Sequence, residues 1–132
     1  MSRYCLDTSA YSNFQRGDER VVEILDRAEW VGVPAIMLGE LRTGFLLGNQ
    51  RARNEDDLSD FLSNPVVEIL VVDEETSRHY AEIVTDLRRA GTPLTTNDIW
   101  IAASAARAGA LVLTYDNHYE QIARVGSIVL PR

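Results

Sequence analysis

Short apolar segments alternate with longer segments of helical periodicity along the whole of this chain. Residues 66–72 (VVEILVV) are rich in β-branched side chains, as strands are. Residues 74–90 carry apolar side chains at helical spacing, among them Tyr80, Ile83 and Leu87. Strands that alternate with helices form a parallel sheet covered by helices on both faces. The pattern predicts an α/β three-layer sandwich around a central parallel sheet of about four to five strands.

The boundaries of these segments follow from their periodicity and from the Gly, Pro and Asn residues between them. We expect strands at residues 3–6, 30–33, 66–72, 110–113 and 127–130. We expect helices at residues 9–15, 18–27, 35–47, 51–62, 74–90, 98–108 and 117–123. No repeat and no Pro/Gly/Ser-rich linker interrupts the 132 residues, so one domain spanning 1–132 is expected.

The formal net charge of −7 argues against a protein held to nucleic acid by a broad basic surface. It does not exclude a nuclease whose acidic groups are concentrated at a metal site. The chain contains no lysine, so every basic side chain is an arginine. Mechanisms that depend on lysine are therefore closed to it.

The lengths of the apolar runs and the number of cysteines restrict the cellular compartment and the redox chemistry. No apolar run is long enough to span a bilayer, and Asp7 comes too early for a secretory signal. Cys5 is the only cysteine, which excludes an intrachain disulfide and a thiolate metal cluster. We expect a cytoplasmic protein in which Cys5 is a buried, inert strand residue.

Acidic residues fall where the predicted strands and helices meet. Asp7 directly follows the first strand, and Asp116 follows the fourth by two residues. In a parallel sheet both positions lie at the carboxyl edge, where ligands bind. Asp98 opens a helix that leads back into the sheet, so it is expected near that edge. Glu40 lies in mid-helix among apolar neighbours (MLGEL), and we expect it to point toward protein.

Each acidic residue also has a purely structural interpretation. Asp7 and Asp98 could cap their helices, where a carboxylate accepts free N–H groups and suits the helix dipole. Asp116 could form an Asx turn, and Glu40 could pair with Arg42 or another arginine. None of these roles explains why several acids should converge at one edge. Two carboxylates 4 Å apart repel by about 1 kcal/mol in water and by about 4 kcal/mol at an effective dielectric constant of about 20.

A bound divalent cation would relieve that repulsion. Carboxylate and water ligands suit Mg²⁺ or Mn²⁺, whereas zinc prefers His or Cys. The chain offers only two histidines and one cysteine, so a zinc site is not expected. The residues predict an Mg²⁺ or Mn²⁺ site built from Asp7, Glu40, Asp98 and Asp116.

Such a site serves nucleic-acid hydrolysis, phosphatases with an aspartyl nucleophile, and phospho-acceptor receiver domains. The last two place a lysine beside the phosphoryl group, and this chain has none. The phosphatases also place an aspartate two residues after the nucleophile, where this chain has Ser9. The comparison therefore disfavours the phosphatases and receiver domains and leaves hydrolysis of a phosphodiester bond in nucleic acid.

Four motifs, in this order and spacing, resemble the PIN-domain ribonucleases and, more narrowly, the VapC-type toxins of toxin–antitoxin pairs. They are LDTSAY (6–11), GELRTG (39–44), TTNDIWIAASA (95–105) and LTYDNHY (113–119). The resemblance covers nearly the whole chain and implies a PIN-like sandwich. It also implies an RNA-cleaving enzyme, commonly a homodimer, that a cognate VapB-type antitoxin neutralises by placing its tail in the active-site groove.

The resemblance assigns roles by position. Asp7, Glu40, Asp98 and Asp116 match the family's acidic residues, which hold Mg²⁺ or Mn²⁺ and activate water. Thr114 matches a hydroxyl that supports the site, and Arg42 falls where the family often has a basic residue near substrate.

Other roles stay open at this point. Arg51 and Arg53 are further substrate candidates, although solvated surface arginines are the preferred interpretation. His118 as a general base is disfavoured against a surface role, and Asn97 and Asn117 could either add ligands or turn the chain. The competing functions are a PIN nuclease in RNA processing or acting on DNA, and a catalytically silent dimeric interaction module.

Overall fold

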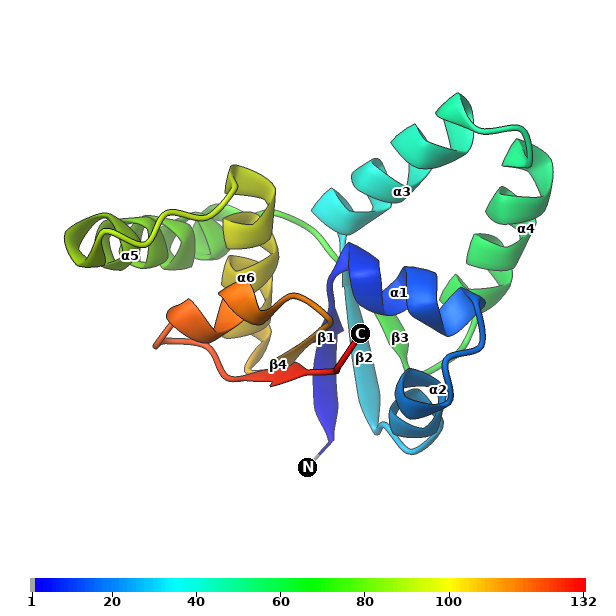
Figure 1. Ribbon diagram of the computed structural model, residues 1–132, viewed down its shortest axis with the longest axis horizontal. Coiled ribbons are helices and arrows are strands. Elements are labelled where there is room, and N and C mark those ends of the chain that lie inside the picture. Colours follow the sequence, from blue (N-terminus) through cyan, green and yellow to red (C-terminus); the bar gives the residue numbers. More distant parts are fainter. Residues whose placement is uncertain (1) are drawn as a thin grey trace.

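The computed structural model describes residues 2–132 and contains one parallel sheet of five strands (Figure 1). The strands are β1 (Arg3–Leu6), β2 (Trp30–Pro34), β3 (Val67–Leu70), β4 (Leu111–Thr114) and β5 (Ser127–Val129). Their order across the sheet is β3-β2-β1-β4-β5, and every neighbouring pair is parallel. The α/β fold predicted from the alternating pattern is therefore confirmed, with five strands.

Helices cover both faces of the sheet. They are α1 (Thr8–Gln15), α2 (Glu19–Asp26), α3 (Ala35–Leu47), α4 (Arg51–Leu62), α5 (Glu74–Ala90), α6 (Thr96–Ala108) and the 3₁₀ helix η1 (Asn117–Gln121). Figure 1 shows α5 and α6 on one side of the sheet, and α1, α2 and α4 on the other. No helix within residues 2–132 combines the length and the apolar character that crossing a bilayer requires.

The strand order places a ligand crevice between β1 and β4. The chain runs from β1 outward to β2 and β3, then returns to the other side of β1 with β4 and β5. The sheet order thus reverses between β1 and β4, and ligands of such sheets bind beyond the carboxyl ends of the strands at that point. Leu6 pairs with Leu113 in register, so the residues that follow both strands emerge side by side.

The strands that flank this crevice are buried. Cys5, Leu6, Val112 and Leu113 are almost wholly inaccessible and belong to the same buried core as Ile101 of α6, whose carbonyl lies 4.0 Å from the Cys5 Sγ. Cys5 is free and buried, as expected, and burial raises the pKa of its thiol well above the usual range. A thiol that stays protonated is a poor nucleophile, so Cys5 acts as a core residue.

Three elements differ from the sequence expectation by more than one residue at an end. The predicted strand 66–72 is shorter because β3 lies at the sheet edge and pairs only with β2, which ends at Pro34 opposite Leu70. The predicted helix 117–123 is a short 3₁₀ helix. The helix predicted to open at Asp98 begins at Thr96, and Thr95 is its N-cap.

Candidate active site

Asp7 lies at the centre of the candidate site, where β1 ends and α1 begins. Its carboxylate is the N-cap of α1, and its Oδ1 accepts hydrogen bonds from the Ala10 amide (2.9 Å) and the Ser9 hydroxyl (2.8 Å). Its Oδ2 accepts from the Thr114 hydroxyl at 2.6 Å. The residue is only 5% exposed, and all three donors are neutral. Burial raises the pKa of Asp7 and the nearby Asp98 adds to the rise, while the hydrogen bonds oppose it.

Thr114, the last residue of β4, joins Asp7 to Asp116. Its hydroxyl donates to Asp7 and accepts the backbone N–H of Asp116 at 2.9 Å. Asp116 caps η1, since its Oδ1 accepts the His118 amide at 2.9 Å. The same Oδ1 lies 2.7 Å from Nδ1 of the exposed His118 ring. The turn interpretation of Asp116 is thus correct, and it leaves the other carboxylate oxygen free of partners within residues 2–132.

Glu40 lies between the starts of two helices. Its Oε1 accepts the Thr8 hydroxyl at 2.6 Å, and its Oε2 accepts the Asn97 side-chain amide at 3.4 Å. The expectation that Glu40 points toward protein is confirmed. The alternative pairing of Glu40 with Arg42 is wrong, because Arg42 bonds Glu55 of α4 at 3.1 Å.

Asp98 lies in the first turn of α6 and does not cap that helix. Its own amide donates to the Thr95 hydroxyl at 3.3 Å, so the capping role predicted for Asp98 belongs to Thr95. The side-chain Oδ1 of Asp98 accepts the hydroxyl of the buried Tyr119 at 3.2 Å. Asp98 and Asp116 line one hollow together with Thr95 and His118.

These contacts bring the four acidic residues predicted from the sequence to one place at the carboxyl edge of the sheet. Each is linked to the next through a direct contact, a neighbouring residue or a shared hollow. The Thr114 hydroxyl bonds both Asp7 and the Asp116 amide, and Asp116 shares a hollow with Asp98. Asn97, the chain neighbour of Asp98, bonds Glu40. Glu40 also accepts from Thr8, the chain neighbour of Asp7.

The four carboxylates make the site negatively charged, and few positively charged side chains offset that charge. Within residues 2–132, no arginine or histidine nitrogen lies within 4.0 Å of a carboxylate oxygen of Asp7, Glu40 or Asp98. The acids do not stand as a preformed ligand set, since no group of three His, Cys, Asp or Glu side chains in the described chain is placed to hold an ion. Each acid is instead held by a hydroxyl or amide donor.

Three residues that hold the acids were not among the sequence candidates, namely Thr8, Ser9 and Tyr119. Asn97, whose role the sequence left open, donates its side-chain amide to Glu40. Thr8 and Ser9 follow Asp7 directly, and hydroxyls next to a capping aspartate are a usable signal. Tyr119 gave no such signal, because its contact with Asp98 spans 21 residues.

Comparison with known proteins identifies the family. The family model for the PIN domain matches residues 4–125. The chain belongs to the PIN domain family. Ribonuclease VapC4 of Mycobacterium tuberculosis is 37% identical to it over 102 residues, which make up 77% of this chain and 78% of VapC4. The resemblance to VapC-type proteins is therefore confirmed.

Solved structures share the fold of this PIN domain. The DNA-bound VapBC of Salmonella typhimurium superposes with a TM-score of 0.85 at 26% identity, over 97% of this chain and 98% of that one. VapBC-5 of Mycobacterium tuberculosis, from the VapBC family of toxin–antitoxin systems, gives a TM-score of 0.78 at 26% identity over 98% and 100%. Both superpositions extend over nearly the whole chain.

Proposed function

We propose that this PIN domain is a metal-dependent endoribonuclease that hydrolyses phosphodiester bonds in RNA, and that it is the toxin of a toxin–antitoxin pair. The likeness to ribonuclease VapC4 and to VapBC-5 supports both parts. The observation that carries the enzymatic part is the series of hydrogen bonds, chain neighbours and one shared hollow that links Asp7, Glu40, Asp98 and Asp116 at the sheet's switch point.

The chemistry of these residues fits a hard divalent cation, Mg²⁺ or Mn²⁺. All the converging groups are oxygen donors, and a buried carboxylate with only neutral partners leaves a negative charge for an ion to balance. Asp7, Asp98 and Asp116 would hold the ion directly or through water, and Glu40 would complete the set. Such an ion supplies a water of lowered pKa and shields the charge that develops on the scissile phosphate.

The chain's own residues orient these acids. The hydroxyls of Thr114 and Ser9 hold the Asp7 carboxylate from two directions. The Tyr119 hydroxyl fixes Asp98 from the core side. The side chains of Thr8 and Asn97 fix Glu40, which we assign to orienting the attacking water. Residues held in this way lose little entropy when substrate binds.

The same acids also offer a way to silence the enzyme. Four carboxylates without arginine partners would accept a guanidinium, which pairs bidentately with a carboxylate. We assign this contact to an arginine of a VapB-type antitoxin. We also propose that the toxin assembles as a homodimer. An antitoxin with that arginine changed to alanine should fail to inhibit, and full inhibition by it would contradict this assignment.

The purified chain tests the function. With Mg²⁺ or Mn²⁺ it should cut single-stranded RNA internally, and an excess of EDTA should abolish the cutting until the metal is restored. Single-stranded DNA of the same sequence is the control and should stay intact. A fully folded preparation that cuts no cellular RNA under any of these conditions would favour the silent interaction module. Equal cutting of the DNA would identify a nuclease of another kind.

A further inference from the structure

Two arginines near the candidate site have no carboxylate partner. Arg16 follows the last turn of α1, and Arg132 follows Pro131 at the end of the described residues. Among residues 2–132, neither has an ion-pair contact within 4.0 Å, whereas six other arginines do. Their positive charges are therefore free to act on a ligand.

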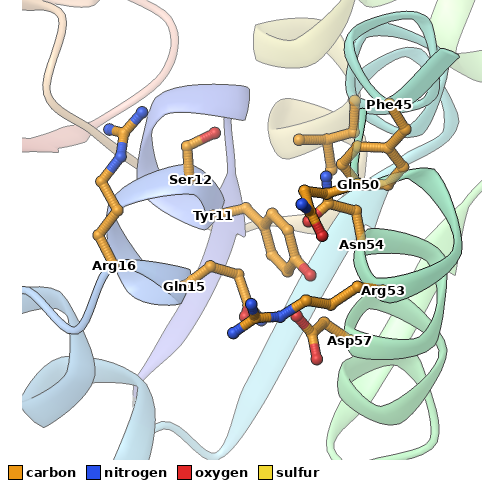
Figure 2. Close-up of a pocket in the computed structure, with 10 residues that line it drawn as sticks. Tyr11, Ser12, Gln15, Arg16, Phe45, Gln50, Arg53, Asn54 and Asp57 are labelled. Carbon is orange, nitrogen blue, oxygen red and sulfur yellow. The ribbon is translucent and has the colours of Figure 1, made fainter. Parts of the chain in front are cut away.

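Both arginines line the same groove. Its walls are Ser9, Ser12, Asn13, Arg16, Asp18, Tyr115 and Arg132. Figure 2 shows that Arg16 points to one side of α1 while Tyr11 and Gln15 point to the other, toward Arg53 and Asp57. The guanidinium of Arg16 thus lies on the side of α1 that faces away from α4.

This groove adjoins the acidic residues. Ser9, which forms part of its wall, donates to Asp7 at 2.8 Å and accepts the Tyr115 amide at 3.0 Å. Arg132 donates from Nε to the Tyr115 carbonyl at 3.4 Å, which holds the Arg132 side chain against the site. A neighbouring hollow shares Tyr115 and Arg132 with Asp116. Arg132 is therefore one residue removed from Asp116, whereas Arg16 lies at the opposite end of α1 from Asp7 and shares the groove wall with Ser9.

The balance of charge around the acids is one-sided. Asp18, the one acid in the groove wall, is paired with Arg20 at 3.2 Å, which holds the pKa of Asp18 below its usual value and offsets its charge. The hollow on the opposite side, beside Asp98 and His118, has no arginine in its lining. Unpaired arginines thus line the groove beside Ser9 and the hollow beside Asp116, and the hollow beside Asp98 is lined by none.

The geometry points to Arg16 and Arg132 as the residues that bind the phosphates of the RNA strand beside the bond that is cut. This inference rests on the proposed ribonuclease function. An RNA strand that approaches a site of four acids, on a chain of net charge −7, needs local positive charge. Arginine presents a planar fork of donors that matches phosphate oxygens. Arg42, which the sequence suggests for this task, is already bound to Glu55.

The test compares two double variants that each remove two positive charges. Arg16→Ala/Arg132→Ala changes the groove. Arg88→Ala/Arg89→Ala, at two exposed positions of α5 that have no ion-pair partner among residues 2–132, is the matched control. Both are made in an Asp98→Asn background that keeps the RNA intact. Their affinity for a single-stranded RNA that the unmodified enzyme cuts is then measured at several salt concentrations.

The groove variant should bind this RNA more weakly by about tenfold or more. Its plot of log affinity against log salt concentration should also be less steep by about 1.4, because each lost phosphate contact on a single strand removes roughly 0.7 from the slope. The control should stay within about twofold of the parent. Equal losses in both variants, or no loss in the groove variant, would overturn the assignment.

A second readout separates RNA from a protein ligand. With Asp98 restored, the groove variant should cut RNA poorly at low RNA concentration and recover at saturation, while the antitoxin still inhibits it. If it cuts normally but escapes the antitoxin, the groove binds an acidic part of that protein and the RNA assignment is wrong. If the unmodified enzyme neither binds nor cuts RNA, the proposed function itself fails.

Discussion

Asp98→Asn is expected to slow RNA cleavage by about a thousandfold, which corresponds to about 4 kcal/mol of lost transition-state stabilisation. Asparagine removes the charge that would hold a divalent ion but keeps an oxygen that can accept the Tyr119 hydroxyl. The residue does not cap α6, so the helix should begin at the same place. Single-turnover cleavage of RNA in Mg²⁺ measures the effect, and the melting temperature checks that the fold is unchanged.

The control for this prediction is Asp56→Asn on the exposed face of α4, which removes the same charge far from the switch point of the sheet. Its cleavage rate should stay within about twofold of the unmodified enzyme, as expected for a surface substitution. If Asp98→Asn kept more than about a tenth of the activity, Asp98 would not be a metal ligand.

Asp7→Asn is expected to abolish cleavage and, in the absence of metal, to make the protein more stable. The Asp7 carboxylate is buried and bonded only to neutral donors, and burial raises its pKa. Asparagine carries no charge to desolvate and is as good an N-cap, so it keeps the contact with the Ala10 amide. We expect the unfolding free energy to rise by roughly 1 kcal/mol, which is the usual size of a stabilising substitution, because the buried charge of Asp7 is removed.

The pH dependence of stability gives this prediction a sign. Between the ordinary value of 3.8 and the raised folded-state pKa of Asp7, the folded protein binds more protons than the unfolded chain. Stability therefore falls as pH rises through that window, and the loss is complete above the folded pKa. Asp7→Asn lacks this loss, so its advantage over the unmodified protein should grow with pH and then level off.

Urea unfolding of both proteins in EDTA, at a series of pH values from about 4 upward, measures that difference. The comparison isolates Asp7, because the other titrating groups are common to both proteins. A variant that is less stable than the unmodified protein near neutral pH would show that the ionised Asp7 stabilises the fold and is not a site held ready for a cation.

The sequence was sufficient for elements with strong local signals. The bounds of α3, α4 and α5 were predicted correctly, because punctuation at 48–49, 64–65 and Gly91 coincides with the ends of clear helical periods. The start of α6 was misplaced, because Thr95, Thr96, Asn97 and Asp98 are all able to cap a helix and only the tertiary context selects one. The order of the strands depends on pairing between distant segments, and no local signal determines it.

The candidate site divides in the same way. Asp7 and Asp116 could be placed from the rule that carboxyl ends of parallel strands share an edge. The partners that hold the other acids could not be placed, since the Thr8–Glu40 bond spans 32 residues and the Tyr119–Asp98 bond spans 21. Arg42 is a substrate candidate from the sequence because it lies just past Glu40 in the same motif, and its bond to Glu55 arises from the packing of α3 against α4.

The claim on which everything else depends is that Asp7, Glu40, Asp98 and Asp116 surround a divalent cation. Anomalous diffraction from crystals of the full chain grown or soaked with Mn²⁺ tests it most directly. We expect an anomalous peak among these four side chains, and its disappearance in crystals of Asp98→Asn. Crystals that bind Mn²⁺ elsewhere, or show no peak at the carboxyl edge between β1 and β4, would contradict the claim.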